Sequence, residues 1–346
     1  MKISGANIGR EQATGELPKE AQCLWFTANG QVEWRTEKLP DLQPGEALVQ
    51  MCASGISRGT ERLVLEGRVP ESEYGRMRAP FQRGEFPFPV QYGYCAVGRV
   101  LAGPSALVGK SVFALHPHQD FFIVPAHALT VLPESLPARR AVLSANMETA
   151  LNGVWDSQAQ AGDTIAVIGA GAVGCLIAAL CARLPGSKVL LADVKPERGP
   201  LAAALGAQFV DARDPGQTLE NCDLVFHTSA SAQGLALALS SAGLEARVIE
   251  MSWYGTSEVA VALGGAFHSQ RLQILASQVG TIAPSHRARW SYARRLAKAV
   301  ELLADPVFDQ MITHEFDYRD SALEFVRALS GDAPGIVSVL NYPTVK

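Results

Sequence analysis

The sequence predicts an α/β protein in which a doubly wound parallel sheet follows a mostly β domain. Three observations predict it. Short apolar runs separated by turn residues fill residues 21–141, apolar runs alternate with helical segments after residue 164, and a glycine-rich turn joins the first of those runs to the first of those helices. Strands and helices that alternate at this spacing are typical of a parallel sheet covered by helices on both faces.

The glycine-rich turn lies in residues 164–174, which read TIAVIGAGAVG. In a GxGxxG turn, Gly169 permits the sharp bend, Gly171 lets the backbone approach a pyrophosphate, and Gly174 lets the helix pack closely on the strand. The N–H groups at the helix start, Ala172 and Val173, favour phosphate because the helix dipole adds to them. The turn therefore predicts a Rossmann dinucleotide site.

A carboxylate at the expected distance favours NAD over NADP. The apolar run 188–192 ends at Asp193, about 20 residues beyond the turn, as the fingerprint requires. A carboxylate there accepts hydrogen bonds from both ribose hydroxyls of NAD and repels a 2′-phosphate. Lys195 and Arg198 follow closely, however, so an NADP-dependent enzyme stays open as the alternative.

Composition excludes several classes of function. A chain of 346 residues is long enough for about two domains, and its formal net charge of −4 gives no basic surface for nucleic acid or for an anionic membrane. We find no apolar run of the ~18 residues that a membrane span needs, and residues 1–20 lack the apolar segment of a secretory signal. The six cysteines form no CxxC pair, so we expect a reduced, cytoplasmic protein.

The remaining elements follow from periodicity and from turn residues. Residues 138–155 and 287–303 are predicted helices, and the last strand of the parallel sheet is predicted within 272–279. Residues 65–89 suit neither strand nor helix and carry arginines between aromatic residues, Tyr74 and Arg78 among them. We interpret this segment either as a solvated surface loop or as a flap over a planar, anionic substrate.

The order of the domains resembles that of the medium-chain dehydrogenase/reductase superfamily. The landmarks are Gly55-Ile56-Ser57-Arg58, the stretch 87–95, Ala161-Gly162-Asp163 and Ser330-Gly331. The resemblance implies a GroES-like catalytic domain at 1–148 and 285–346, a Rossmann domain at 149–284, and a homodimer formed at the sheet edge near 272–279. Residues 55–61 with Gly93-Tyr94 most resemble bacteriochlorophyllide hydroxyethyl dehydrogenases, which use NAD to oxidise an alcohol on a planar macrocycle.

The chain departs from this family at the metal ligands. Zinc alcohol dehydrogenases carry a Cys where this chain has Ser57, a His where it has Tyr94, and a third ligand near Ser144 or Ala145. Hydroxyl and methyl groups cannot replace thiolate, imidazole and carboxylate as zinc ligands. We therefore expect a zinc-independent enzyme.

Without a metal, a side chain must exchange a proton with the substrate oxygen or donate a hydrogen bond to it. Tyr94 occupies the position of the zinc-binding histidine, and the resemblance places His116 and His118 beside the substrate and Glu148 near the nicotinamide. The hypothesis is that Tyr94 and one of the two histidines bracket the reacting oxygen. For each candidate, packing, a loop contact or a salt bridge is the structural alternative.

The resemblance also implies contacts with the cofactor and the substrate. Arg58 corresponds to a pyrophosphate contact and Thr149 lies under the nicotinamide. The nicotinamide side is expected to be lined by Ser229, Ser252 and Trp253. Substrate contacts are expected from Ser57, Tyr74, Arg78 and Tyr254.

The leading prediction is an NAD(H)-dependent oxidoreductase that interconverts an alcohol and a ketone or aldehyde on a small-molecule substrate. An NADPH-dependent enoyl or quinone reductase is the alternative among enzymes. A non-catalytic dinucleotide sensor is the alternative of another class, because a fold does not dictate a function.

Overall fold

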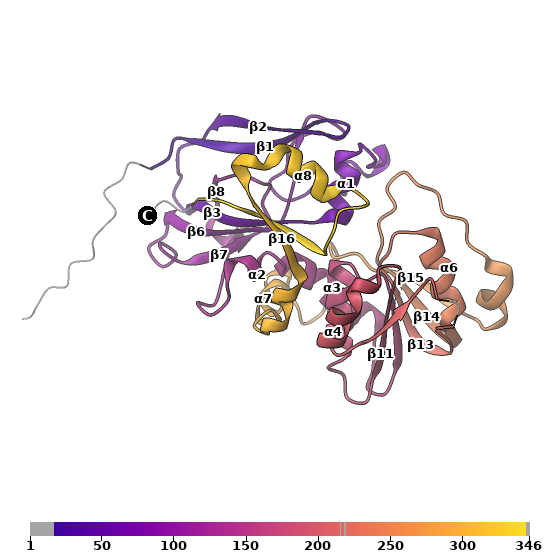
Figure 1. The fold of residues 1–346 in the computed structure, drawn as a ribbon. Helices are drawn as coiled ribbons and strands as arrows, with labels where there is room; N and C mark the ends of the chain where they lie inside the picture. Colours follow the sequence, from indigo (N-terminus) through magenta and orange to yellow (C-terminus); the bar gives the residue numbers. More distant parts are fainter. Residues whose placement is uncertain (1–16, 215, 218, 344–346) are drawn as a thin grey trace, which may run out of the picture.

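The computed structural model describes residues 17–214, 216–217 and 219–343, which form two lobes (Figure 1). One lobe is built on a six-stranded sheet whose neighbouring strands are all parallel. Its strands, in spatial order, are β12 (Gln208–Asp211), β11 (Lys188–Asp193), β10 (Thr164–Ile168), β13 (Cys222–His227), β14 (Ala242–Glu250) and β15 (Gln273–Ala276). This is the order of a doubly wound dinucleotide-binding sheet, so the predicted fold class is confirmed.

The other lobe is mostly β. A seven-stranded sheet contains β3 (Glu46–Ile56), β6 (Ala96–Ala102), β7 (Ser111–Ala114), β8 (Phe121–Pro125), β9 (Thr130–Val131), β16 (Ile312–Asp317) and β17 (Val337–Asn341). A four-stranded sheet contains β1 (Glu20–Ala28), β2 (Gln31–Lys38), β4 (Arg83–Gly84) and β5 (Val90–Gln91). Because β17 pairs with β3, the end of the chain returns to the lobe in which the described chain begins.

Helices connect and cover the sheets. They are α1 (Arg58–Leu65), α2 (Ala138–Ala141), α3 (Ser144–Ser157), α4 (Ala172–Cys181), α5 (Gly199–Ala204), α6 (Ala232–Ser241), α7 (Tyr292–Leu302) and α8 (Ser321–Leu329). In Figure 1, α8 lies over the sheet of β1, and α3 lies between the two lobes. Helix α3 packs against both α4 and α7. It therefore links the lobe of the six-stranded sheet, residues 164–276 (the dinucleotide lobe), to residues 292–341, which return to the β-rich lobe (the returning segment).

Four elements differ from expectation. The predicted helix over 138–155 forms two helices, α2 and α3, separated by a turn at residues 142–143. The predicted helix over 287–303 begins only at Tyr292, because the Ser291 hydroxyl accepts the Arg294 N–H at 3.2 Å and caps the helix there. Strand β2 and helix α1 form where no element is predicted. Positions along β2 alternate between exposed and half-buried, with few apolar residues, so its pairing with β1 decides its conformation.

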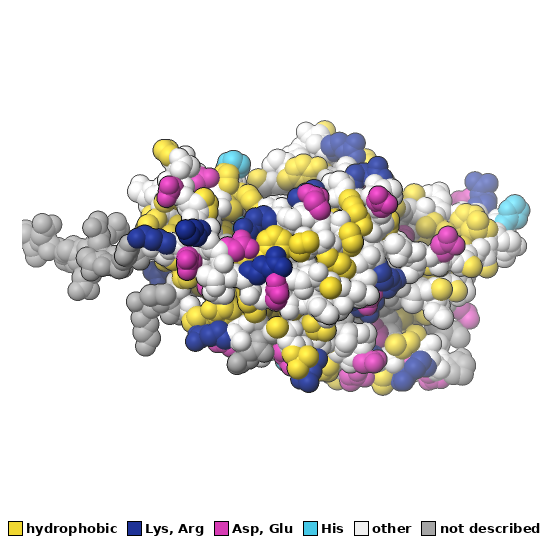
Figure 2. All heavy atoms as spheres, turned by 90° about the horizontal axis from the view of Figure 1, so that it is seen from above, with side chains coloured by type: hydrophobic (Ala, Val, Ile, Leu, Met, Phe, Trp, Pro, Cys, Tyr) yellow, Lys and Arg dark blue, Asp and Glu magenta, His cyan; other side chains and the backbone are white. Residues whose placement is uncertain are grey.

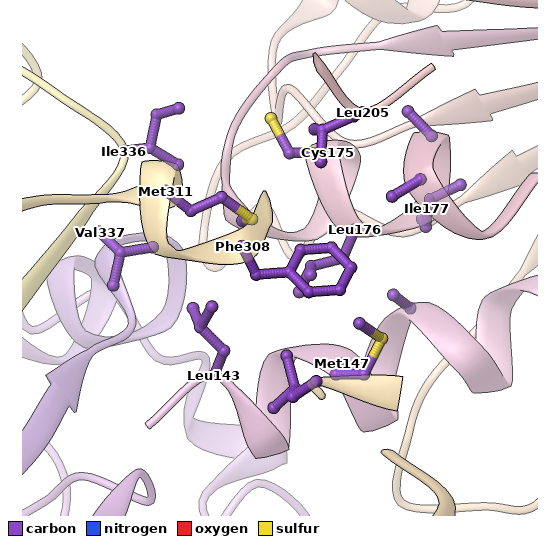
Figure 3. Close-up of a cluster of buried hydrophobic side chains, with 14 of the residues drawn as sticks. Leu143, Met147, Cys175, Leu176, Ile177, Leu205, Phe308, Met311, Ile336 and Val337 are labelled. Carbon is purple, nitrogen blue, oxygen red and sulfur yellow. The ribbon is translucent and has the colours of Figure 1, made fainter. Parts of the chain in front are cut away.

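One apolar core joins the lobes. Figure 3 shows Leu143 and Met147 facing Leu176 of α4, with Phe308 and Met311 of the returning segment closing the cluster. Each of these side chains is at most 1% exposed. Burial of this kind stabilises by about 25 cal/mol per Å² of apolar surface, so this core holds α3 firmly between the lobes.

The surface carries both signs of charge. Figure 2 shows basic and acidic side chains intermixed over the face it presents, in keeping with the small net charge of −4. Among the helices of residues 17–343 that the structure describes, none combines the length and apolar character that crossing a membrane would require.

Candidate functional site

The glycine-rich turn has the geometry of a phosphate cradle. Gly169 adopts φ +107°, and a Cβ on Gly174 would lie 1.9 Å from the Gly169 carbonyl oxygen, so both positions require glycine. A Cβ on Gly171 would meet nothing within 4 Å. Ala172 and Val173 follow at the start of α4, where both are half-buried. The turn thus leaves open space where a pyrophosphate would approach the backbone.

Asp193 lies beside this turn. Its Oδ2 accepts the Ala170 N–H at 2.7 Å, and its Oδ1 accepts the Lys195 N–H at 2.9 Å. Each carboxylate oxygen retains a second lone pair, so the group can still accept from ribose hydroxyls. The buried Arg198 lies on the same side, where it donates to the carbonyls of Ala170 and Gly335.

The Arg58 guanidinium is occupied by the chain itself. It donates to four carbonyl oxygens of the returning segment at 3.0–3.2 Å, those of Ala328, Ala333, Pro334 and Gly335. Burial, together with the neighbouring Arg198 and Arg62 charges, lowers the pKa of Arg58. Arg58 therefore holds the loop 328–335 against α1 of the β-rich lobe, and a pyrophosphate would have to share or displace these bonds.

Two hydroxyls occupy the positions that hold zinc ligands in the resembling family. The Tyr94 hydroxyl donates to Ser57 Oγ at 2.5 Å, and the Ser57 N–H donates to Glu61 Oε1 at 2.7 Å. The residue at the third position, Ser144, is buried, and its hydroxyl donates to the Ala141 carbonyl at 2.6 Å. Burial raises the pKa of Tyr94 well above its usual value, so this phenol stays protonated. The pair is a hydrogen-bond donor, and its oxygens are poor ligands for zinc.

Behind this pair lies a buried carboxylate that the sequence analysis does not single out. Glu61 is 0% exposed, and its Oε2 lies 3.0 Å from Nε2 of His118, which is 1% exposed. The other imidazole nitrogen lies 2.7 Å from Ser54 Oγ, which in turn lies 3.0 Å from the Tyr342 hydroxyl. His118 is therefore enclosed, and it reaches Ser57 only through Glu61. Glu61 belongs to α1, which the sequence analysis does not predict. A helix predicted at that place would have pointed to Glu61 as a residue next to Ser57.

His116 lies elsewhere. Its ring stacks between Phe81 and Phe122, at centroid distances of 5.6 and 4.1 Å. Burial lowers its pKa to about 3, so the ring is neutral near pH 7. It lines a cavity of about 350 Å³ that neither Tyr94 nor the glycine-rich turn lines. The structure thus does not bring His116 and Tyr94 together.

Glu148 and Thr149 are engaged within the fold. Glu148 Oε1 accepts from Nε of Arg295 at 3.0 Å, and both side chains are buried. Burial raises the pKa of Glu148 even though Arg295 opposes it. The Thr149 hydroxyl donates to the Ala145 carbonyl at 3.0 Å, one turn earlier in α3.

The arginine-rich segment 65–89 is ordered by contacts of its own. Tyr74 packs on Phe86 with ring centroids 5.6 Å apart, and Arg78 pairs with Glu85 at 2.6 Å. Arg78 also donates to the Gln82 carbonyl. These contacts keep Tyr74 and Arg78 within the segment.

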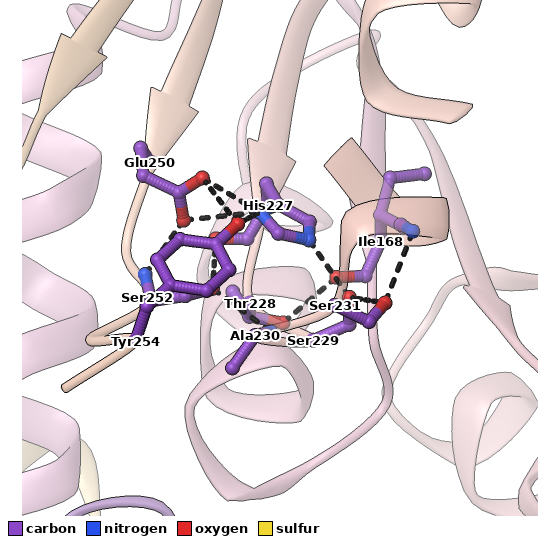
Figure 4. Close-up of polar contacts among 10 residues, drawn as sticks. Ile168, His227, Thr228, Ser229, Ala230, Ser231, Glu250, Ser252 and Tyr254 are labelled. Atoms are coloured by element: carbon purple, nitrogen blue, oxygen red, sulfur yellow. Dashed lines mark hydrogen bonds and ion pairs between the residues drawn. The ribbon is translucent and has the colours of Figure 1, made fainter. Parts of the chain in front are cut away.

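The ends of β13 and β14 bring Ser229, Ser252 and Tyr254 together (Figure 4). A Cβ on Gly169 would lie 2.9 Å from the Ser229 nitrogen, so this serine adjoins the glycine-rich turn. The Ser252 hydroxyl accepts the Ala230 N–H at 3.0 Å. Trp253 packs against the β-rich lobe, and the next residues bind the same lobe through the Thr256 N–H and the Arg68 carbonyl, 3.1 Å apart.

Similarity to known proteins agrees with this fold. No family model matches the chain. It is 30% identical over 196 residues to a zinc-type alcohol dehydrogenase-like protein of Haemophilus influenzae, covering 49% of this chain and 56% of that one. It is 26% identical over 229 residues to D-guloside 3-dehydrogenase of Escherichia coli K12, covering 62% and 65%. The chain thus matches between about half and two thirds of the length of these relatives.

Solved structures extend the likeness in fold to nearly the whole chain. A protein of Sinorhizobium meliloti 1021 described as a zinc-binding dehydrogenase, bound to NADP, covers 94% of this chain and matches over its own whole length, with a TM-score of 0.74 and 19% identity. An alcohol dehydrogenase of E. coli CFT073, complexed with NADH, covers the same shares with a TM-score of 0.73 and 18% identity.

In fold and in sequence, the chain is thus similar to dehydrogenases of the alcohol dehydrogenase-like type. These similarities agree with the resemblance to the medium-chain dehydrogenase/reductase superfamily that is drawn from the sequence.

Proposed function

We propose that this chain interconverts an alcohol and a ketone or aldehyde with a nicotinamide dinucleotide, NAD(H) in preference to NADP(H), and without zinc. One observation carries the proposal: the glycine-rich turn leaves open space at Gly171 and has the Asp193 carboxylate beside it. The relatives named as dehydrogenases support the reaction class, and the structures solved with NADH and NADP support the kind of cofactor.

In this proposal the dinucleotide supplies the hydride acceptor or donor, and the chain does the rest. Ala172 and Val173 present backbone N–H groups to the phosphates, and Asp193 accepts from the adenosine ribose. Tyr94 stays protonated and donates to Ser57, which leaves the Ser57 O–H free to donate to a carbonyl oxygen. Such a donor pair stabilises negative charge that develops on that oxygen.

Zinc independence rests on the chemistry of the donor set. Ser57, Tyr94 and Ser144 offer neutral hydroxyls that already bond to each other or to the backbone. A zinc ion would find no thiolate, imidazole or carboxylate among them.

We also propose that the substrate carries a planar ring and that the protein forms a homodimer. Trp253 and Tyr254 supply aromatic surface near the ends of β13 and β14. Strand β15 lies at the edge of the parallel sheet with all of its residues exposed, Ile274 and Leu275 among them, which suits pairing with a second copy. Turnover of porphyrin-like alcohols and the mass of the protein in solution test these two points.

The cofactor choice is tested with Asp193→Asn. We expect the unchanged chain to bind NADH at least tenfold more tightly than NADPH, measured by fluorescence titration, because a 2′-phosphate would face the carboxylate. Asp193→Asn keeps an oxygen for the Ala170 N–H and should shrink this preference. Asp211→Asn, at the paired position on β12, is the matched control and should leave the preference intact. Tighter binding of NADPH to the unchanged chain would contradict the assignment and favour the enoyl or quinone reductase.

The role of Tyr94 is tested with Tyr94→Phe. We expect kcat to fall about 100-fold, as is typical when a positioned proton donor is removed, while the Kd for NADH stays the same. Tyr92→Phe is the matched control, because Tyr92 is a buried tyrosine whose ring packs on Tyr94 at 6.1 Å. Near-full turnover by Tyr94→Phe would remove Tyr94 from the mechanism. Tight NADH binding with no turnover of any alcohol or ketone by the unchanged chain would favour the sensor.

A further inference from the structure

A hydrogen-bonded chain of Glu250, His227 and Ser229 joins the ends of β13 and β14 (Figure 4). His227 Nδ1 lies 2.8 and 3.0 Å from the two Glu250 carboxylate oxygens. His227 Nε2 lies 2.7 Å from Ser229 Oγ. The imidazole is 0% exposed, whereas Ser229 is exposed, so the hydrogen-bonded series runs from a half-buried carboxylate through a buried imidazole to a serine that a reagent can reach.

The fold builds this arrangement from two features. In the parallel register of β13 and β14, His227 lies directly opposite Glu250, which places their side chains on the same face of the sheet. In α6, a Cβ on Gly234 would lie 2.1 Å from Ser229 Oγ and 2.8 Å from His227 Nε2. Only glycine at this position leaves room for the serine and the imidazole to meet.

The other partners fix the direction of each hydrogen bond. Glu250 also accepts the Ser252 N–H at 2.8 Å and the Tyr254 O–H at 3.1 Å. Burial alone would raise the pKa of Glu250, but the bonds from His227 and Ser252 outweigh it and leave the pKa below its usual value. The ionised carboxylate therefore holds the proton on Nδ1, and Nε2 is left as an acceptor.

The serine end is consistent with this direction. Ser231 Oγ accepts the Gly234 N–H at 3.0 Å, so its own hydrogen is free to go to Ser229 Oγ, 2.9 Å away. Ser229 can then donate its hydrogen to His227 Nε2. This is the arrangement of an activated serine: a nucleophile bonded to a base, and a base oriented by a carboxylate.

We propose that Ser229 is a nucleophile, with His227 as its general base and Glu250 as the residue that orients His227, and that this group beside the proposed dinucleotide site reacts with activated esters. Ser229 Oγ forms a bond to the acyl carbon, and its proton passes to His227 Nε2. The leaving alcohol takes that proton as its bond to the acyl carbon breaks. Water then releases the acyl group as a carboxylic acid by the same proton route, which regenerates the serine.

The surroundings suit negative charge on the reacting group. Helix α6, of ten residues, begins three positions after Ser229 at Ala232, and its N-terminal end carries a partial positive charge. Ser229 also adjoins Gly169 of the glycine-rich turn. The activity needs no dinucleotide, so its test, run without one, is independent of the proposed oxidoreductase function.

Covalent labelling by diisopropyl fluorophosphate, without dinucleotide, tests the proposal. Ser229 Oγ displaces fluoride from phosphorus, and the serine proton passes to His227. We expect peptide mass analysis to find the label on Ser229 and p-nitrophenyl acetate to be hydrolysed. Ser229→Ala should abolish both signals. Ser240→Ala, an exposed serine of α6 bonded only to the Leu237 carbonyl, is the matched control and should change neither.

The base and the orienting carboxylate are tested separately. His227→Gln should slow labelling about 100-fold, the usual range for loss of a general base, and Glu250→Gln should slow it less. Because His227 is buried, circular dichroism must show that each variant is folded. If His227→Gln fails to fold, Glu250→Gln decides. An unlabelled Ser229 in the folded, unchanged chain, or labelling that is unaffected in a folded base or carboxylate variant, would overturn the proposal.

Discussion

Gly174→Ala should destabilise the dinucleotide lobe by about 3 kcal/mol, because the added methyl would lie 1.9 Å from the Gly169 carbonyl oxygen. That oxygen belongs to the backbone of the turn, so the helix or the turn itself must move to accept the methyl. We expect the midpoint of thermal unfolding to fall by roughly 6 °C or more, measured by circular dichroism. NADH binding should be lost at the same time, because the phosphate cradle is deformed.

Gly171→Ala separates the effect on the stability of the fold from the effect on cofactor binding. Gly171 has φ −76° and ψ −173°, which alanine adopts without strain, and its Cβ would meet nothing within 4 Å. The midpoint of thermal unfolding should therefore stay within about 1 °C, because a substitution that creates no clash usually changes the free energy of unfolding by less than about 0.5 kcal/mol. Affinity for NADH should nevertheless fall about tenfold, because the methyl enters the space left for the pyrophosphate. Unchanged NADH affinity in Gly171→Ala would contradict the placement of the phosphates.

Arg295→Met should cost about 3–5 kcal/mol of unfolding free energy, because it leaves the Glu148 carboxylate buried without its cation. Arg295 is 2% exposed and also donates to Asn152 Oδ1 at 2.6 Å and to the Val279 carbonyl at 2.5 Å. Chemical denaturation measures the loss. The double variant with Glu148→Gln should recover part of it, since no buried charge is then left unpaired.

Arg294→Met is the matched control for this loss. Arg294 is the preceding residue of α7, is exposed, and lies over the Trp290 ring at 4.0 Å. Its removal should cost about 1 kcal/mol or less. If Arg295→Met were as mild as Arg294→Met, the Glu148–Arg295 pair would not be what fastens α3 to α7.

Local patterns suffice for the dinucleotide lobe. The spacing of Gly169, Gly171 and Gly174 depends on steric demands within a few residues, and Asp193 follows at the end of the next strand, so both are readable from the chain. The β-rich lobe is less readable. Strand β2 carries mostly polar residues and takes its conformation from its pairing with β1, which no pattern of residues within β2 predicts.

The candidate site shows the same division. Ser57 and Tyr94 are predicted to share a site and are hydrogen-bonded across 37 positions of the chain. The two histidines, two residues apart, diverge: His118 meets Glu61, while His116 stacks between Phe81 and Phe122. In a regular strand, residues two apart would point to the same side, but residues 116–118 lie outside the strands. The partners that each ring meets therefore depend on distant elements.

The sequence by itself determined the class of the fold and the position of the glycine-rich turn, because each rests on short-range periodicity or on steric needs of single residues. Only the tertiary structure decided which polar side chains meet: Arg58 with the returning segment, Glu148 with Arg295, and His227 with both Glu250 and Ser229. The physical reason is that strand register and helix packing bring together residues far apart in the chain. A hydrogen bond depends on where its two atoms lie within a few tenths of an ångström, which no spacing along the sequence specifies.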